Sequence, residues 1–455
     1  MFMQSLDSAI INTSLPRMAQ SFAVTTVDLS LSITAYMLAA AAVSPLSGFL
    51  ADRFGSRTVI VTAMLAFTLA SVGCGMAVDL PWFVAARLAQ GAGGALMLPV
   101  GTAVVMRMAG KEQMMRFVAL MVWPALAAPI IGPVLGGFIT QHIDWRWNFW
   151  LNLPLGLVLA GLVAAFVPQH RGEPRRLDWL GFVLCSGALV CLIAGFQRSS
   201  LPGGERRVAA ALLALGALTG AAALRHLRRH QAPLLSLGVL RYPSFGFCAW
   251  LPGVIYYALF SAAPFLLPLL FQLGFGLSPT AAGVWVLVYF VGNLGIKPFT
   301  TAILRRFGFQ RVMWVNGLLV GATMLGCGML RPATPSWLIA PVLLAAGATR
   351  SMQMTSLMTL VYTDIPNAQK NLASTLLSML QLTFSALGVA LGAFLLALFQ
   401  RAPGAMGLGV LHHAFWVLAL IAAGGGIAFR RMDANIGIEV SLHRPARQKI
   451  GALPE

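Results

Sequence analysis

The stretch Gly48-Phe49-Leu50-Ala51-Asp52-Arg53-Phe54-Gly55-Ser56-Arg57 decides the fold of this chain. It lies between two long apolar runs, so it is predicted to be a tight charged turn that joins two membrane helices. A related turn, Ile303-Leu304-Arg305-Arg306-Phe307-Gly308, follows much later at the same kind of junction, with Arg305 in the place of Asp52. Because one short turn occurs twice, the sequence predicts two related halves.

The composition excludes a soluble globular protein. Hydrophobic residues make up 58% of the chain, charged residues make up 10%, and the mean hydropathy is +0.81. Apolar stretches of about 20 residues, each long enough to cross a bilayer, recur nearly to the end. The sequence therefore predicts an all-α polytopic membrane protein that is embedded in a lipid bilayer.

The net charge of +18 does not indicate a nucleic-acid partner. In a soluble protein such a charge would suggest one, but here the basic residues are confined to short gaps between apolar runs. The five cysteines all lie inside apolar runs, so we expect neither disulfides nor a metal set. The adjacent histidines at 412 and 413 have no evident ligand partners in the sequence, and we expect no cofactor.

We count about fourteen spans and divide the chain into four segments. Residues 1–168 are predicted to form a six-helix bundle, 169–244 two additional helices with cytoplasmic linkers, 245–430 a second six-helix bundle, and 431–455 a basic tail. The predicted spans are roughly 1–17, 29–51, 58–78, 81–107, 115–140, 148–168, 178–198, 207–226, 245–271, 279–303, 312–331, 336–360, 370–399 and 410–430.

Two features of the loops and ends complete the predicted topology. Lys and Arg are concentrated in the loops of the side that holds Arg53 and Arg228, so this side is predicted to be cytoplasmic, with both termini inside. The first span, which ends near Arg17, is shorter than a bilayer requires. We interpret this as a start site placed too far downstream or as a shortened chain.

Several stretches resemble motifs of the Major Facilitator Superfamily, and specifically of its fourteen-span drug:proton antiporter branch. They are, in chain order, Leu6–Pro16 at the first helix, Gly48–Arg57 at the charged turn, Arg87–Gly94 in the fourth helix, Gly132–Gly137 in the fifth, and Trp145–Gly156 at the entry to the sixth. Ser56 stands where the family usually has a basic residue, and Ala128 replaces an upstream glycine. Within the branch, the chain is most similar to the MdtD-type group of multidrug exporters.

The resemblance implies two six-helix bundles plus two extra helices, with a cavity near the membrane midplane that opens alternately to each side. It implies a proton-coupled exporter of small organic molecules that works as a monomer in the bacterial inner membrane. An exporter of organic anions, such as carboxylates or anionic metal chelates, is the alternative within transporters. A membrane enzyme or a sensor is a more distant alternative, since we find no nucleophile, paired carboxylates or added soluble domain.

Asp7 and Arg87 are the candidate proton-coupling pair. Asp7 is the acidic residue that we place well within a span, where a carboxylate is costly and is a functional candidate by default. Arg87 must point to the bundle interior and find acceptors there. A structural clamp, in which Asp7 is locked to Arg87 or Arg87 holds the first-helix backbone, is the alternative to proton carriage.

The charged turn is a candidate conformational latch. We expect Asp52 to face the start of a helix of the other half, where free amides carry partial positive charge, and to release it when the halves rock. The family likeness suggests the start near Asn371. The latch residues are Gly48, Asp52, Arg53, Gly55, Arg57 and Arg107. The alternative is that Asp52 only orients its own turn.

Further candidates lie in the fifth helix and in the second half. Gly132, Pro133, Gly136 and Gly137 match the antiporter motif and are expected to let the fifth helix bend and pack closely. Lys297 and Arg350 are cations inside spans of the second half, where we find no intramembrane acid to pair with them. Their positive electrostatic field would favour anionic substrates. The substrate-cavity candidates are Asn12, Lys297, Arg350, Gln353 and Gln381. The alternatives are that Lys297 snorkels to the cytoplasmic surface, that carbonyls and cavity water satisfy the cations, and that Gln381 serves ordinary helix packing.

Overall fold

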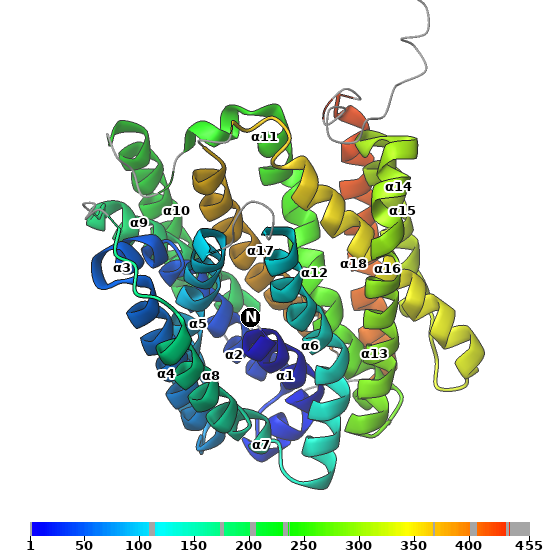
Figure 1. Cartoon of the computed structure of the whole chain (residues 1–455). Coiled ribbons are helices and arrows are strands. Elements are labelled where there is room, and N and C mark those ends of the chain that lie inside the picture. Colours follow the sequence, from blue (N-terminus) through cyan, green and yellow to red (C-terminus); the bar gives the residue numbers. More distant parts are fainter. Residues whose placement is uncertain are drawn as a thin grey trace, which may run out of the picture.

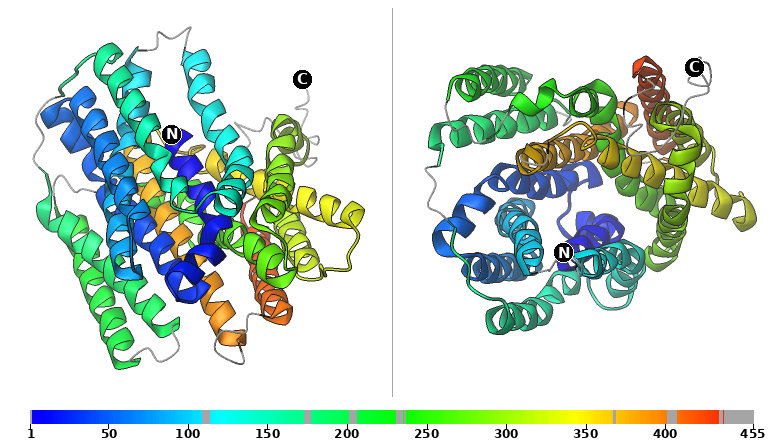
Figure 2. Two further views of the ribbon diagram at one scale, coloured as in Figure 1. Left: turned by 90° about the horizontal axis from the view of Figure 1, so that it is seen from below. Right: turned by 45° about the horizontal axis from the view of Figure 1, so that its top comes forward.

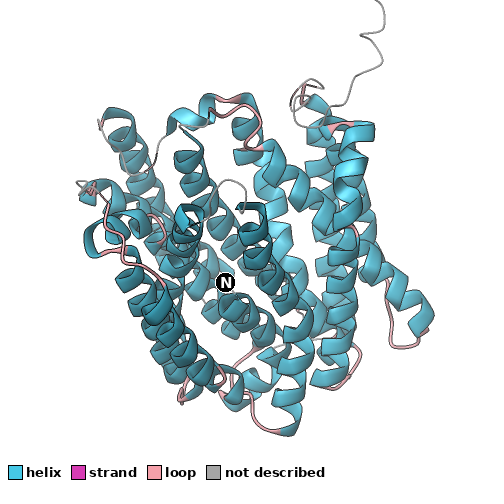
Figure 3. Cartoon of the chain, in the orientation of Figure 1, coloured by secondary structure: helices cyan, strands magenta, loops and turns pink. Residues whose placement is uncertain are grey.

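The computed structural model describes residues 2–108, 114–172, 177–200, 206–230, 235, 237–366, 369–400, 407–433 and 436. Within these ranges the side chains at 103, 106–108, 114–126, 199–200, 251 and 371–372 are not described. The described chain is helical throughout, joined by short loops (Figures 1 and 3). Of the predicted basic tail, only residues up to 433 and residue 436 are described.

The helices fall into a first group, an added pair and a second group. The first group comprises α1 (Phe2–Ser21), α2 (Thr26–Val43), α3 (Leu46–Phe54), α4 (Ser56–Gly75), α5 (Leu80–Met108), α6 (Met114–His142), α7 (Trp147–Trp150) and α8 (Asn152–Phe166). The added pair is α9 (Trp179–Ser200) and α10 (Arg206–Arg229). The second group comprises η1 (Leu237–Arg241), α11 (Pro243–Ala249), α12 (Leu251–Leu269), η2 (Leu270–Gly274), α13 (Pro279–Gly295), α14 (Lys297–Phe307), α15 (Phe309–Cys327), α16 (Ser336–Leu360), α17 (Lys370–Phe399), α18 (Leu408–Ala428) and η4 (Phe429–Arg431).

The helices match the predicted spans in order but differ at several boundaries; for example, the predicted span 279–303 is two helices, α13 and α14, separated at Ile296. The first helix does not end near Arg17. It continues to Ser21, because Met18 and Ala19 are buried against the bundle. The predicted span 29–51 is two helices, α2 and α3, separated at Ser44-Pro45.

By length and apolar character, nine of the described helical segments can cross a membrane. The bent pair α13 and α14, which meet at 46°, raises this number to ten when it is taken as one span. Neither α1 nor α16 is among them. These helices carry Asp7 and Arg350, whereas Arg87 lies on α5, which is among the candidate spans. The total of fourteen spans remains a prediction.

The two charged turns have the same construction. Gly55 ends α3 and begins α4 with φ 91°, and Gly308 ends α14 and begins α15 with φ 76°. A side chain is strained at such a φ, so glycine is needed at both positions. In each half the chain after the last long helix also returns to this turn. The Ser56 amide donates to the His170 carbonyl (2.9 Å), and Gln310 donates to the Arg430 carbonyl (3.0 Å).

The two groups meet through α6 against α13 and through α2 against α17. Hydrogen bonds join them in the middle of α1 and at the end of α6. Gln272 Nε2 donates to the Thr13 carbonyl (2.8 Å), and the Thr280 amide donates to Gln141 Oε1 (3.2 Å). The α9–α10 pair lies at the periphery, where α9 contacts both α2 and α17 (Figure 2). The added helices therefore bridge the junction of the two halves.

Candidate functional site

A buried polar network surrounds Asp7 at the centre of the first group. Arg87 Nη1 donates to Asp7 Oδ2 at 2.7 Å, and the side chains of both residues are 1% exposed. Gln90 Nε2 and Asn152 Nδ2 both donate to Asp7 Oδ1, at 2.9 and 3.1 Å. Both carboxylate oxygens are thus satisfied by donors from α5 and α8. A buried carboxylate needs such hydrogen-bond donors, because burying an unpaired charge is costly.

The helices position this network by simple geometry. Arg87 and Gln90 are three residues apart on α5 and so share a face, and Arg87 Nη1 also donates to Gln90 Oε1 (2.6 Å). The ring of Tyr36 from α2 lies 4.3 Å from the Arg87 guanidinium carbon. Asn152, the first residue of α8, also donates to Ser71 Oγ on α4 (2.9 Å). Five helices therefore converge on one ion pair.

This arrangement fits both hypotheses for the pair. The carboxylate is clamped as a structural ion pair would be, with one charge neutralising the other. It also has the donors that would have to rearrange if a proton neutralised Asp7 and left Arg87 uncompensated. A network of this kind has two electrostatic states and can couple protonation to helix position.

The second group repeats the residue pattern of this network but not its hydrogen bonds. Arg350 and Gln353 lie on α16 with the same three-residue spacing as Arg87 and Gln90 on α5. Gln353 is fully buried and accepts from Asn316 Nδ2 of α15 (2.8 Å). The helices α5 and α16 are equivalent, because each follows the helix that begins at a charged turn. The two halves therefore carry the same Arg-x-x-Gln pattern.

The difference between the halves is the acid. Arg350 Nη2 donates to the Phe260 carbonyl of α12 (3.1 Å), and its guanidinium lies near the rings of Phe260 and Phe290. Among the described residues no carboxylate is within ion-pair distance of Arg350. Like that of Arg87, its Nε is buried without a partner. In the part of the chain that the structure describes, Arg350 thus has no counter-ion, whereas Arg87 has Asp7.

Two further polar groups lie on helices that contact α16. Lys297, at the start of α14, is half-buried, and α14 packs against α16. Tyr289 of α13 packs against α16 at Gly347, one turn before Arg350, and its hydroxyl is buried without a hydrogen-bond partner. Two cations and an unpartnered phenol are the donors expected of an anion-binding site.

The remaining predicted cavity residues are separate from this cluster. Gln381 of α17 is half-buried and donates to Met358 Sδ (2.9 Å). Asn12 is half-buried on α1. Gln353 faces Asn316 and the Met313 carbonyl, so its hydrogen bonds are used in packing α16 against α15.

The fifth-helix motif is a close-packing surface. A methyl group at Gly132 or Gly136 would clash with Ala9 or Ile10 of α1. A methyl group at Gly137 would clash with the Pro279 carbonyl, and one at Gly283 of α13 would clash with the Pro133 carbonyl. The motif therefore joins α6 to α1 and, across the junction of the halves, to α13.

The latch residues lie against the linker that follows α8. The Asp52 carboxylate packs against Gly172, and Arg57 Nη1 is 3.5 Å from the Ala164 carbonyl. Arg53 is exposed over the rings of Phe49 and Phe54, and Gly48 has open space around its Cα. The side chains of Arg107 and Asn371 lie outside those described, so the latch contact across the halves stays a prediction.

Sequence reasoning gave no role to Gln90, Asn152 or Ser71. Gln90 and Asn152 lie in stretches that were singled out for other reasons. A comparison of the two halves would have found Gln90, since Arg87-x-x-Gln90 recurs as Arg350-x-x-Gln353. Ser71 had no such signal, because a serine in a membrane helix is common and only the packing of α4 against α8 gives it a partner.

Known proteins resemble this chain in sequence and in overall fold. The sequence pattern of the Major Facilitator Superfamily matches residues 1–393. A Cronobacter sakazakii protein named "Putative multidrug resistance protein MdtD" is 33% identical over 457 residues, which covers 98% of this chain and 95% of the relative. A Salmonella heidelberg protein of the same name is 33% identical over 454 residues, covering 98% and 96%.

Solved structures share the architecture at low sequence identity. A crystal structure of a D-xylose-proton symporter superposes with TM-score 0.67 at 14% identity, covering 95% of each chain. An autoinhibited POT family peptide transporter gives TM-score 0.64 at 14% identity, covering 98% of each chain. The inward-open xylose transporter XylE from E. coli gives TM-score 0.62 at 13% identity, covering 95% of this chain and 93% of that one. At these identities the likeness concerns the fold alone.

Proposed function

Because the chain belongs to the Major Facilitator Superfamily, we propose that it is a proton-coupled transporter that exports small organic molecules of the multidrug type by alternating access. The family and its MdtD relatives make the chain a polytopic membrane transporter rather than an enzyme. Proton coupling, the outward direction and the substrate class are the parts that we propose.

The observation that carries the proposal is the buried pair of Asp7 and Arg87. A proton that binds Asp7 removes the only negative charge of the network and leaves the Arg87 guanidinium without its counter-ion. Gln90 and Asn152 would then lose a charged acceptor and gain freedom to move. Since these residues come from α5 and α8, protonation would shift the balance between two packings of α1 against its neighbours.

Transport in reconstituted vesicles tests this proposal. Inside-out proteoliposomes that contain the protein should accumulate a lipophilic fluorescent dye when the lumen is made acidic, and a protonophore should collapse the uptake. Asp7→Asn should abolish the gradient-driven component and retain dye binding. Asp28→Asn, an acid in the exposed cap of α2, is the matched control and should behave as wild type. Uptake that ignores the imposed gradient would refute proton coupling.

An exporter of organic anions is the second candidate, and the unpaired Arg350 favours it. The second group keeps the Arg-x-x-Gln pattern but has a backbone carbonyl where the first group has Asp7. With Lys297 and Tyr289 on the neighbouring helices α14 and α13, a carboxylate or an anionic chelate would supply the missing negative charge. The substrate would thus complete in the second half the ion pair that the protein itself supplies in the first.

Binding by the purified protein separates the two candidates. Arg350→Gln should weaken binding of a dicarboxylate by at least about tenfold, because a charged hydrogen bond contributes about 1.5–3 kcal/mol. Binding of a neutral dye should change little. Arg331→Gln, an exposed arginine between α15 and α16, is the control. Equal weakening of both ligands would point to a role of Arg350 in folding and would remove the anion proposal.

We also propose the setting in which the protein works. The MdtD relatives support the bacterial inner membrane, and the bias of basic residues supports both termini in the cytoplasm. A monomer of this fold contains both halves and the path between them, so we propose that it needs no second subunit. Its partners are then the substrate, protons and the lipid bilayer.

A further inference from the structure

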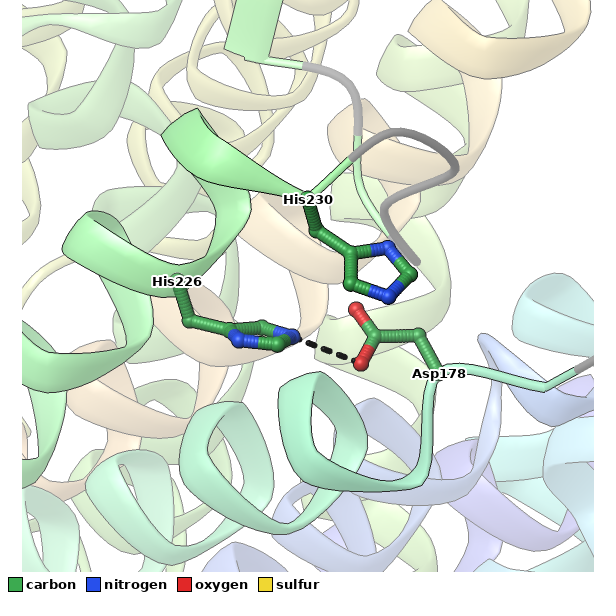
Figure 4. Close-up of side chains that lie close together, drawn as sticks. All are labelled: Asp178, His226 and His230. Atoms are coloured by element: carbon green, nitrogen blue, oxygen red, sulfur yellow. Dashed lines mark hydrogen bonds and ion pairs between the residues drawn. The ribbon is translucent and has the colours of Figure 1, made fainter.

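A cluster of metal-ligating side chains lies at one end of the α9–α10 pair, far along the chain from the residues discussed above. Asp178 immediately precedes α9, while His226 and His230 occupy the last turn of α10 and the residue after it. One carboxylate oxygen and one nitrogen from each histidine all lie within 4.8 Å of one another. Figure 4 shows the three side chains pointing toward one another from the two antiparallel helices.

We propose that Asp178, His226 and His230 form a binding site for one divalent transition-metal ion, with Zn²⁺ as the best fit. Two imidazole nitrogens and one carboxylate oxygen are ligands that Zn²⁺ prefers, and three protein ligands leave a fourth position for water. Mg²⁺ and Ca²⁺ prefer oxygen ligands, so the two histidines disfavour them.

The geometry of each ligand supports the site. His226 and His230 are four residues apart, so they lie on one face of α10, and their rings are 5.0 Å apart between centroids. His226 Nε2 lies 2.7 Å from Asp178 Oδ1. Tetrahedral zinc holds its ligand atoms about 3.4 Å apart, so this pair would open slightly and the widest pair would close, which side-chain rotations can provide.

The backbone that carries the ligands is held in place. The Gly181 amide donates to Asp178 Oδ1 (2.8 Å), which fixes the carboxylate at the start of α9. The helices α9 and α10 approach so closely that a Cβ at Gly195 would lie 3.1 Å from the Ala209 carbonyl. Because the two helices are already tightly packed, their residues lose little conformational freedom when the ion binds.

The surroundings allow access but do not attract cations over long range. Asp178 is buried, His226 is half-buried, and His230 is exposed, so an ion can enter from the solvent side. Arg225, Arg228 and Arg229 are exposed on the same end of α10 and oppose a cation. The affinity must therefore come from direct coordination rather than from the local field.

A bound ion would connect the start of α9 to the end of α10. The ion would bind at the end of the hairpin where α9 begins. The linker between α8 and α9 contacts the charged turn at Gly55 before it reaches this end. Binding would stabilise the folded hairpin, because the unfolded chain holds the two ends apart.

The test uses the full-length protein in detergent, with any affinity tag removed and metals stripped by a chelator. Titration with Zn²⁺ by calorimetry should give one site per chain, and Co²⁺ should give the visible bands of a tetrahedral nitrogen–oxygen site. Zn²⁺ should also raise the midpoint of thermal unfolding. These measurements do not depend on transport, so their outcome is independent of the proposed function.

Single variants locate the ion. His226→Ala, His230→Ala and Asp178→Asn should each weaken Zn²⁺ binding by at least about tenfold, since loss of even an outer-shell partner costs 10–100-fold. Asp178→Asn keeps an oxygen to accept from the Gly181 amide, so its fold is preserved. His142→Ala, an exposed histidine on α6, is the matched control. The absence of a one-to-one site, or equal affinity in all four variants, would overturn the proposal.

Discussion

At the residue scale, the ion pair of Asp7 and Arg87 is the feature that most constrains the protein. Two charges with 1% exposed side chains are costly to bury, and their attraction offsets that cost only when the other donors and acceptors are satisfied. Gln90 and Asn152 satisfy both remaining positions on Asp7 Oδ1. The same residues can thus serve stability and proton coupling, and paired variants are needed to separate the two roles.

Asp7→Asn should destabilise the protein by about 3–5 kcal/mol, because it leaves the buried Arg87 charge without a partner. The double variant Asp7→Asn with Arg87→Gln removes both charges and should recover most of that loss. Thermal unfolding in detergent measures both changes. Gradient-driven transport should remain absent in the double variant. If it transports against a gradient, neither residue is the proton-coupling group.

At the element scale, glycines set how closely the helices approach and how the charged turns are made. The face of α6 that carries Gly132, Gly136 and Gly137 meets backbone atoms of α1 and α13. At Gly55 the constraint is instead the positive φ of the turn. A change at either place acts on a helix as a whole, because the backbone cannot yield as a side chain can.

Gly137→Ala should destabilise the contact of α6 with α13, because the added methyl group meets the Pro279 carbonyl. We expect a loss of about 1–3 kcal/mol, the usual cost of overpacking, together with slower transport. Thermal unfolding and initial uptake rates measure the two effects. Gly161→Ala on α8 is the control, since nothing lies within 4 Å of a Cβ at that position. Equal effects at both glycines would contradict this account.

Gly55→Ala should cost about 1–3 kcal/mol, the range for a residue forced into a φ reserved for glycine. The added methyl group would also meet the side chain of Gln169, which donates to the Phe54 carbonyl (2.9 Å). Gly48→Ala, in the same turn but with open space around it, should be close to neutral. Thermal unfolding of the two variants measures the difference, and equal stability would argue against strain at Gly55.

At the scale of the whole molecule, hydrogen bonds join the two halves. The bond of Gln272 to Thr13 lies in the middle of α1, and the bond of Thr280 to Gln141 lies at the end of α6. In an alternating-access cycle the contacts at such an end must open for the substrate to pass. The added α9–α10 pair contacts both halves through α2 and α17, so it lies where it can follow or limit this motion.

A reversible cross-link across this end should stop transport. Cysteines at Gln141 and Thr280, in a background without the native cysteines, should cross-link, and transport should fall to background until a reductant is added. The control pair places cysteines at Thr58 and Gln169, which are hydrogen-bonded at 2.8 Å within the first half. That cross-link should leave transport near its starting rate. Full activity with the first pair closed would exclude opening at this end.

The sequence by itself determined the class of fold and the prediction that the chain has two related halves. The order of apolar stretches predicts the order of the helices, because each segment needs only its own length and hydropathy to cross a bilayer. The repeated turn predicts Gly55 and Gly308 in equivalent places, since glycine is required wherever φ is positive. Arg87 and Asp7 were identified because charges are costly in membrane helices.

Only the tertiary structure decided which groups these charges meet. Asn152 is 145 residues from Asp7 along the chain, and Ser71 gains its role only through contact with Asn152. In the same way, Asp178 and His226 are 48 residues apart, so their spacing along the chain does not predict that Asp178 lies beside His226 and His230. The end of α1 at Ser21, beyond Arg17, was likewise set by burial of Met18. Such contacts depend on how helices pack, and local sequence patterns do not encode which distant faces will touch.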